Sequence, residues 1–453
     1  MISLWSSFSP PDYLRTCIAW TRQHKHFIIL GVILCFAAFL RFWAAPLSAG
    51  PDVAQFWSFA KVFQTHGLDF YRYADAYTEN FPYPGWGYFY PPVWLLLLRV
   101  ALFFVPASSA TDSMIDPAWR FAMKTPIIAA DLAIGLLLYW AVPGSKWRKL
   151  LFAGLWLFHP TAWYESAVFG QFDAIAAAFL LASVIMLMRG KDKLAFLLAG
   201  LTVLTKQHTF LAVGMMLIIC VRYMNKRRLL TNCAIFVGVI AVFSLPFLLT
   251  GNFLPYARSL FLPGSPPGSQ DPLCFSLSGT GSLLTYLYNV FGWDTIGLIS
   301  FVPPVLIVAL IITAILCYRR LITPLQGALV GFLVFIGFFY RINYQYLVIY
   351  IPLAILLASR TSYKSEKIFA LVLALLPAIW IWTTNIPWWF HNFKPHYYWV
   401  SPILARIGLF DRYLPDYAYV SFDMVLMCLS LAYVVLAFWK WRQPAGLSSD
   451  MVK

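Results

Sequence analysis

Residues 189–228 read RGKDKLAFLLAGLTVLTKQHTFLAVGMMLIICVRYMNKRR, and this stretch decides the fold. A basic cluster stands at each end, two apolar arms run inward, and Lys206, Gln207 and His208 separate the arms. Because clustered lysines and arginines favour the cytoplasmic side of a membrane, the stretch predicts a hairpin that enters the bilayer and returns. The alternative is a single span with a snorkelling lysine, which would put one basic cluster on the wrong side.

The length of the first arm limits how far the hairpin reaches. Residues 194–205 form an arm of 12 residues. A helix of that length rises about 18 Å, whereas the hydrocarbon core is about 30 Å thick. Lys206 is therefore expected below the outer surface, where a charge is tolerated only beside water or a partner. A polar crater open to the outer side would meet this need.

The whole composition agrees with a membrane protein. Of 453 residues, 61% are hydrophobic and 11% are charged, whereas a soluble domain carries roughly 25% charged residues. Apolar runs recur from end to end, which predicts one membrane domain over residues 1–453. The net charge of +15 follows from positive-inside bias, so no nucleic-acid partner is expected. The seven cysteines stand singly and lack metal-binding spacing, and no metal or cofactor is expected.

The topology follows from the basic clusters. If all of them are cytoplasmic, every stretch between two clusters crosses the membrane an even number of times. This predicts an all-α polytopic protein with about twelve transmembrane helices, both termini inside, and outer loops at 46–120, 251–295 and 387–416. The clusters are Arg15/Arg22/Lys25, Lys146/Arg148/Lys149, Arg189/Lys191/Lys193, Arg222/Lys226/Arg227/Arg228, Arg319/Arg320, Arg360/Lys364/Lys367 and Lys440/Arg442.

The large first loop, 46–120, is bounded by predicted spans at 27–45 and 121–142. Within it, residues 90–105 are apolar enough to cross the membrane. A third crossing would put the cluster at Lys146 outside, so this segment is predicted to be an interfacial or re-entrant helix.

Polar residues from distant parts of the chain are predicted to meet on the outer side. Two carboxylates beside a lysine and an arginine can bind an anion and leave one carboxylate free to accept a proton. A lipid-linked phosphate entering sideways from the bilayer is a natural anion for such a site. The residues are Asp52; Gln171 and Asp173; Lys206, Gln207 and His208; and Arg341, Asn343 and Gln345.

Each of these residues also has a structural interpretation. Asp52 can be a solvated loop residue, and Asp173 can stabilise a helix N-terminus. Lys206 can snorkel, and Arg341 can anchor a helix at the interface. Ionisable residues within a membrane are nevertheless functional candidates by default, and their convergence favours a functional site.

Five short motifs carry a family resemblance. The segment PDVAQFW at 51–57, followed by YPP at 90–92, resembles the GT-C superfamily of polyprenol-phosphate-dependent glycosyltransferases. GQFD at 170–173 is similar to their G-(H/Q)-F element, and TKQ at 205–207 resembles the lysine turn of dolichyl-phosphate-glucose-dependent enzymes and of bacterial mannosyltransferase-like relatives. RINYQY at 341–346 stands where those enzymes carry V-H-E-K or H-x-Q-Y, but it lacks a His-Glu-Lys sequence.

The resemblance implies a GT-C-like fold and an inverting transfer of a hexose, mannose or glucose, from a polyprenyl- or dolichyl-phosphate donor. The acceptor would be a hydroxyl of a glycan, a lipid-linked glycan or a protein on the non-cytoplasmic side. The membrane would be a bacterial plasma membrane or the endoplasmic reticulum, with its lipids as further partners. By this resemblance Asp52 is the general base; Lys206, His208 and Arg341 bind the donor phosphate; and Tyr90, Gln171, Asp173, Gln207, Asn343 and Gln345 bind substrate.

The competing function is a transporter or flippase of lipid-linked sugars, which would also need polar residues within the membrane. Alternating-access carriers commonly show internal repeats with broken helices in corresponding positions. The first loop, 46–120, has no counterpart later in the chain, and the polar turns lie on one predicted side. This asymmetry favours an enzyme that opens to one compartment.

Overall fold

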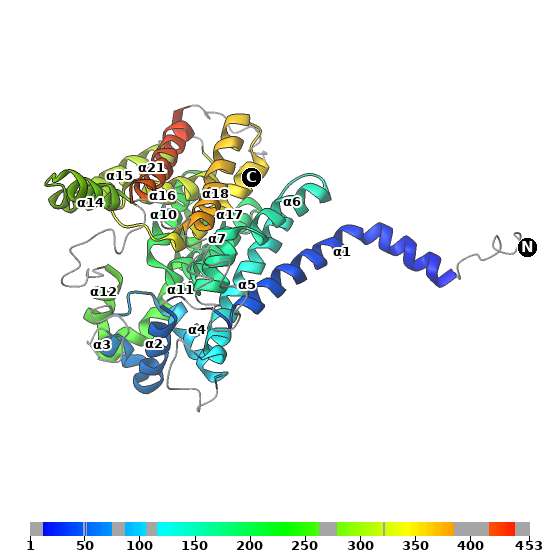
Figure 1. The fold of residues 1–453 in the computed structure, drawn as a ribbon, viewed down its shortest axis with the longest axis horizontal. Helices are drawn as coiled ribbons and strands as arrows, with labels where there is room; N and C mark the ends of the chain where they lie inside the picture. The colour runs from blue at the N-terminus through cyan, green and yellow to red at the C-terminus, as the bar shows by residue number, and fades with distance from the viewer. Residues whose placement is uncertain are drawn as a thin grey trace, which may run out of the picture.

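The computed structural model describes residues 12–48, 50, 52–74, 87–105, 116–261, 279–319, 322–384 and 416–439. These residues form helices joined mostly by short turns (Figure 1). The elements are α1 (Asp12–Ala44), α2 (Asp52–His66), η1 (Gly67–Asp69), α3 (Phe70–Ala74), α4 (Pro92–Phe103), α5 (Pro117–Ala141), α6 (Lys146–Leu157), α7 (Pro160–Trp163), η3 (Tyr164–Phe169), α8 (Asp173–Met188), α9 (Asp192–Thr205), η4 (Gln207–Thr209), α10 (Phe210–Tyr223), α11 (Lys226–Phe247), η5 (Leu248–Asn252), α12 (Phe253–Phe261), α14 (Thr280–Phe291), η6 (Ile296–Phe301), α15 (Val302–Arg319), α16 (Pro324–Phe338), α17 (Tyr344–Arg360), α18 (Lys364–Thr384) and α21 (Asp416–Trp439).

Five helical stretches are long and apolar enough to cross a membrane: His24–Ala44, Pro117–Ala141, Lys226–Arg258, Gly297–Arg319 and Val420–Trp439. Large apolar side chains on α1, α11 and α15 remain exposed, among them Phe36, Val242 and Ile312. Extended apolar surface of this kind is stable against lipid rather than water. The chain is therefore a helical integral membrane protein, as the composition predicts.

The centre of the molecule is built from shorter helices. α8, α16 and α17 have 16, 15 and 17 residues and are apolar on almost every face. A helix that is apolar all round must be buried, and most residues of these three are. α8 packs against α9 and α5, and α16 packs against α10 and α21. At about 1.5 Å per residue these helices rise only about 22–26 Å, less than the hydrocarbon core of about 30 Å.

A buried ion pair joins α1 to α5. Arg41 donates from Nε to Asp131 Oδ2 at 2.7 Å and from Nη2 to Oδ1 at 3.2 Å, and neither side chain is exposed. Ser166 Oγ donates to the same carboxylate at 2.6 Å. Arg41 lies 90 positions from Asp131 in the sequence, so no local pattern indicates this pairing. The pair explains how two charges persist inside the helical bundle.

Five of the seven predicted cytoplasmic clusters meet at one end of the described structure. Arginine side chains that donate hydrogen bonds link them, so their common location does not depend on the positive-inside rule. The contacts are Arg360 to the Ala141 carbonyl at 2.8 Å, Arg148 to the Ser359 carbonyl at 2.5 Å, Arg189 to the Trp140 carbonyl at 3.1 Å, Arg222 to the Arg319 carbonyl at 3.0 Å, and Arg228 to the Asp192 carboxylate.

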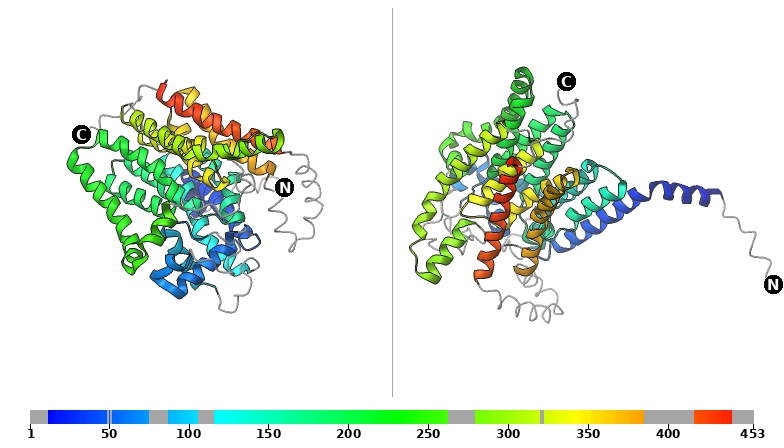
Figure 2. Two further views of the ribbon diagram at one scale, coloured as in Figure 1. Left: turned by 90° about the vertical axis from the view of Figure 1, so that its left-hand side faces the viewer. Right: turned by 90° about the horizontal axis from the view of Figure 1, so that it is seen from above.

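The elements of the first loop gather at another end. α2, α3 and α4 lie together near α12, at the lower end of Figure 1, and the N-terminal half of α1 projects away from the other helices (Figures 1 and 2). The segment predicted to be an interfacial helix at 90–105 forms α4, from Pro92 to Phe103.

The two later outer loops that the sequence predicts also fall partly within the described residues. The loop at 251–295 contains α12, α14 and the residues just before η6, so its described part is mostly helical rather than irregular. The loop at 387–416 lies outside the described residues except for Asp416, the first residue of α21. The count of about twelve crossings stays a prediction, because length and composition identify five spans and a set of shorter apolar helices.

Candidate functional site

A buried lysine fixes the turn that leads from α1 to Asp52. Lys124 of α5 is fully buried, and its ammonium group holds the end of α1 against η3. The three N–H donors of this group are shared among four main-chain carbonyls: those of Ala45 at 3.2 Å, Ser48 at 2.6 Å, Ala167 at 2.9 Å and Val168 at 2.8 Å. Because a buried charge needs full hydrogen bonding, these contacts tie the two segments to one position.

Two glycines allow the same segments to approach closely. The Gly50 amide donates to the Phe169 carbonyl at 3.0 Å, and a Cβ on Gly50 would meet that oxygen at 2.7 Å. Gly170 has a φ of 85°, in the left-handed region that favours glycine. A Cβ on Gly170 would also lie only 3.0 Å from Lys124 Cε, so glycine leaves room for the lysine side chain. The GQFD motif therefore begins with glycine for a conformational reason.

Asp52 meets Gln171 across this contact. Asp52 is the first residue of α2 and is half-buried, and its Oδ2 accepts a hydrogen bond from Gln171 Nε2. Burial raises the pKa of the Asp52 carboxyl above its ordinary value, while the Gln171 amide and the charge of Lys206 oppose this shift. A carboxylate with a raised pKa is a stronger base than an ordinary aspartate.

Asp173 pairs with Lys206 at the open end of the α8–α9 hairpin. Lys206 Nζ lies 2.7 Å from Asp173 Oδ2, and the side chains are 1% and 0% exposed. α9 ends at Thr205, and Lys206 leaves the helix with an extended backbone. The sequence predicts that a lysine at this depth needs water or a partner, and the partner is Asp173.

Aromatic rings enclose the ammonium group of Lys206. It lies 4.4 Å from the ring centroid of Phe172, 5.1 Å from that of Tyr90 and 5.4 Å from that of Tyr346. Phe172 stacks on Trp94 of α4 with centroids 4.5 Å apart. The YPP and GQFD motifs, which are far apart in the sequence, are thereby packed together. The ammonium group of Lys206 gains electrostatic stabilisation from the aromatic rings.

The other residues of the turn lie against this enclosure from η4. Gln207 Nε2 donates to the Phe89 carbonyl at 2.6 Å, which holds the turn against the segment before Tyr90. His208 packs on Tyr346 and Phe335, with ring centroids 4.3 and 5.5 Å away. His208 Nε2 is buried without a hydrogen-bond partner among the described residues.

The connection between α16 and α17 brings Arg341 to the same place. Arg341 keeps part of its surface exposed and lies within electrostatic range of Tyr90 and Tyr346. Asn343 precedes α17 and is also partly exposed, whereas Gln345 is buried in the first turn of that helix. The role of Asn343 and Gln345 in the site stays a prediction, because the described contacts of these two residues do not assign one.

One residue of the site is missing from the sequence predictions. Glu165 lies in the π-helical turn η3 and is 2% exposed. Its carboxyl group is within electrostatic range of Asp173, Lys206 and Asp52. The sequence could have indicated Glu165 as a candidate site residue, because a glutamate rarely lies inside an apolar membrane segment without a function.

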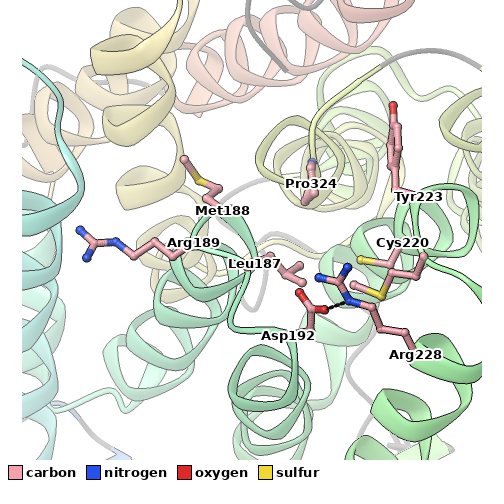
Figure 3. A pocket seen from close by; sticks show the side chains of 10 residues that line it. Leu187, Met188, Arg189, Asp192, Cys220, Tyr223, Arg228 and Pro324 are labelled. Atoms are coloured by element: carbon pink, nitrogen blue, oxygen red, sulfur yellow. Dashed lines mark hydrogen bonds and ion pairs between the residues drawn. The ribbon is translucent and has the colours of Figure 1, made fainter. Parts of the chain in front are cut away.

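A different cavity lies at the opposite end of α8 and α9. It has a volume of about 310 Å³ and is lined by Asp192, Arg228, Cys220 and Tyr223, among others (Figure 3). In Figure 3 Asp192 and Arg228 meet beside the cavity, whereas Arg189 extends away from it. α8 has 16 residues, so this cavity is about 24 Å from Asp173 along the helix axis. It belongs to the basic end of the molecule.

These features define a helical integral membrane protein with a buried cluster of ionisable groups at the end of its central hairpin. No protein-family model matches the chain, and no curated protein sequence matches it. The chain is similar to the crystal structure of ArnT from Cupriavidus metallidurans bound to undecaprenyl phosphate, with 17% identity, a TM-score of 0.45, and coverage of 90% of this chain and 76% of that chain. A likeness this distant defines neither activity nor substrate, so the function rests on the residues of this chain.

Proposed function

We propose that this protein is an inverting glycosyltransferase. It moves a hexose from a polyprenyl-phosphate donor to a hydroxyl acceptor on the non-cytoplasmic side of the membrane. The observation that carries the proposal is the cluster itself: a half-buried carboxylate, Asp52, next to the Lys206–Asp173 pair and close to Arg341.

Asp52 acts as the general base. The acceptor oxygen attacks the anomeric carbon, its proton passes to the Asp52 carboxylate, and the bond between that carbon and the phosphate oxygen breaks. The electron pair of the broken bond leaves with the polyprenyl phosphate. Gln171 donates to Asp52 and so fixes the orientation of the carboxylate, and the raised pKa of Asp52 brings its basicity closer to the operating pH.

Positive groups stabilise the leaving phosphate. The departing group gains negative charge in the transition state, and fixed cations in a dry site lower the energy of that charge. Arg341 is partly exposed and can donate several hydrogen bonds to a phosphate. Lys206 already has a carboxylate partner, so it contributes its charge while keeping the contact with Asp173.

The depth of the cluster fits a lipid-linked donor. α8 and α9 are too short to cross a hydrocarbon core of about 30 Å, and a phosphate on a polyprenyl chain reaches such a depth from within the bilayer. A water-soluble nucleotide sugar has no hydrocarbon chain that would hold it at that depth. The hexose is mannose or glucose by resemblance of the motifs, and the membrane is a bacterial plasma membrane or the endoplasmic reticulum.

A transporter of lipid-linked sugars is the weaker alternative. A carrier needs a binding site that both compartments reach in turn. Here the carboxylates of Asp52, Glu165 and Asp173 gather at one end of the hairpin, and basic side chains hold described helices together at the other. A general base, Asp52, that lies at the Lys206 end of the hairpin only is the arrangement that a transferase needs.

The donor class is tested with purified protein in lipid nanodiscs. Polyprenyl-phosphate mannose, polyprenyl-phosphate glucose and the corresponding nucleotide sugars are offered in parallel, with a mixture of glycan and lipid-linked acceptors. We expect transfer from a polyprenyl-phosphate donor and none from a nucleotide sugar. Mass spectrometry of lipid-linked glycans from cells with and without the protein then identifies the acceptor. Transfer from nucleotide sugars alone would contradict the proposal.

A further inference from the structure

The strongest unexplained feature of the site is Glu165, a buried carboxyl group without a hydrogen bond. Both Oε1 and Oε2 are inaccessible and have no partner among the described residues. A buried carboxyl group that is left unpaired destabilises a fold, and groups of this kind are rare in stable proteins. A second buried glutamate, Glu366, shows the usual arrangement, in which the buried carboxyl group accepts hydrogen bonds. It is also 2% exposed, but it accepts from Gln326, Thr361 and Tyr433.

The fold holds Glu165 in place through its backbone. Its carbonyl accepts from the amides of Gly170 at 3.0 Å and Gln171 at 2.8 Å, which closes the π-helical turn onto the GQFD motif. π-helical turns occur frequently at functional sites. The side chain is thus fixed beside the two motif residues, Gln171 and Asp173, that contact Asp52 and Lys206.

Other acceptor atoms around Glu165 are also unmatched. Gln171 must present its amide nitrogen to the Asp52 carboxylate, which leaves Oε1 without a donor. Asp173 uses Oδ2 for Lys206, and its Oδ1 is unpaired. Gln207 donates to a carbonyl, and its Oε1 is likewise buried and unpaired. The described part of the site therefore offers several hydrogen-bond acceptors that lack donors.

The chemistry of these atoms selects the class of ligand. An anion would be repelled by two carboxylates and by amide oxygens. A metal ion would need a compact set of ligands, and the described residues contain no group of three or more His, Cys, Asp or Glu side chains arranged for one. Several hydroxyl groups on one rigid ring, each an O–H donor, match acceptors of this kind.

We propose that Glu165, with Gln171 Oε1 and Asp173 Oδ1, binds hydroxyl groups of the hexose that is transferred. The inference rests on the proposed function and divides the site into two parts. The phosphate of the donor lies toward Arg341 and Lys206, and the sugar lies against the acceptor atoms of η3 and the GQFD motif. Glu165 is then a residue that sets sugar specificity, while Asp52 accepts the proton.

The experiment compares wild type with Glu165→Met on polyprenyl-phosphate hexose and on monodeoxy analogues that each lack one hydroxyl. Wild type is expected to lose about 10- to 100-fold in kcat/KM on the analogue without the contacted hydroxyl, because the buried carboxyl group is then left without its hydrogen-bond partner. Glu165→Met should lose about as much on the intact donor and should no longer distinguish it from that analogue.

A stability measurement separates this role from a structural one. Methionine has nearly the volume of glutamate, and removing an unpaired buried carboxyl should leave the Tm unchanged or raise it. The matched control, Glu366→Met, takes an acceptor from three donors and should lower the Tm without changing the preference among analogues. If Glu165→Met does not fold, Glu165→Gln replaces it and should weaken the discrimination rather than abolish it.

The outcomes distinguish the two proposals. If wild type transfers hexose and the Glu165 variants keep full discrimination at every position, Glu165 does not bind the sugar, and the proposed function stands. If wild type uses no polyprenyl-phosphate hexose, both proposals are wrong.

Discussion

The two ends of the α8–α9 hairpin each carry an aspartate paired with a basic residue, and they differ in almost every other respect. At one end Asp173 and Lys206 are 0% and 1% exposed and 2.7 Å apart, among aromatic rings and unpaired acceptors. At the other end Asp192 and Arg228 are 9% and 39% exposed, beside further lysines and arginines. The hairpin joins both, so the difference comes from what surrounds each pair.

That difference separates a structural ion pair from a candidate site. The Asp192–Arg228 pair gains less from its contact and costs less to desolvate, because water solvates part of the Arg228 side chain, which is 39% exposed. A fully buried pair is expensive to desolvate and is weak evidence for stability by itself. Its persistence at Lys206, next to Asp52 and Glu165, agrees with a binding and catalytic role for that end.

The largest expected effect is on turnover, from Asp52→Asn. Asparagine keeps the size of the side chain but cannot accept the proton at neutral pH. Since a general base contributes roughly 10²–10⁴-fold, the rate of transfer should fall by that factor, while the donor still binds. The control is Asp192→Asn at the other end, which should transfer sugar at close to the wild-type rate. A wild-type rate for Asp52→Asn would make Asp173 the leading candidate for the base.

The next effect is on folding stability, from Lys206→Met. Removing one member of a buried pair leaves Asp173 charged and unpaired, at a cost of about 3–5 kcal/mol. The same change at the exposed pair, Arg228→Met, should cost about 0–1 kcal/mol. Thermal unfolding in detergent measures both. The double variant Lys206→Met/Asp173→Asn removes both charges and should recover much of the lost stability. Equal losses of folding stability in Lys206→Met and Arg228→Met would show that the two ion pairs do not differ in the way proposed.

A smaller effect on donor use is expected from Arg341→Met. Losing a charge-assisted contact to the phosphate should cost about 1.5–3 kcal/mol, roughly 10- to 150-fold in kcat/KM. Arg222→Met is the control, because Arg222 donates to the carbonyls of Tyr318 and Arg319 at the basic end. Donor kinetics like those of wild type in Arg341→Met would remove that residue from the phosphate site.

The smallest effect concerns pH. Asp52 must be ionised to accept a proton, and burial raises its pKa above the ordinary value of about 4. Activity should therefore be complete well above the raised pKa and should be lost as the pH falls through it, at a higher pH than for an ordinary aspartate. A profile of kcat/KM against pH measures this limb. An acid limb centred at or below about 4 would show that Asp52 is not the group that titrates.

The sequence was enough to predict the central hairpin, because the positive-inside rule and helix rise act on local residues. It predicted a first arm too short to cross the membrane and a lysine at its end that needs water or a partner, and the length of α9 and the Asp173 contact agree with these expectations. The crater open to the outer side stays a prediction. It also predicted, from the sided topology, that Asp52, Gln171 and Lys206 lie together, and the contacts of Asp52 agree with this.

The remaining features depend on contacts that no local pattern records. Lys124 lies in the predicted span 121–142, and its four carbonyl partners come from segments more than 40 positions away on either side. The pairing of Arg41 with Asp131 is equally remote. Glu165 lies in a run that otherwise resembles an ordinary apolar helix, and only the fold reveals that its carboxyl group has no partner among the described residues.

The central claim is that the buried end of the hairpin binds the donor. Electron cryo-microscopy of Asp52→Asn with a polyprenyl-phosphate hexose tests it most directly, because the variant should bind the donor without consuming it. We expect density for the phosphate beside Arg341 and Lys206, and for the sugar between Glu165, Asp173 and the substituted side chain at position 52. Density for the phosphate in the cavity lined by Asp192 and Arg228, with the Lys206 end empty, would contradict the account.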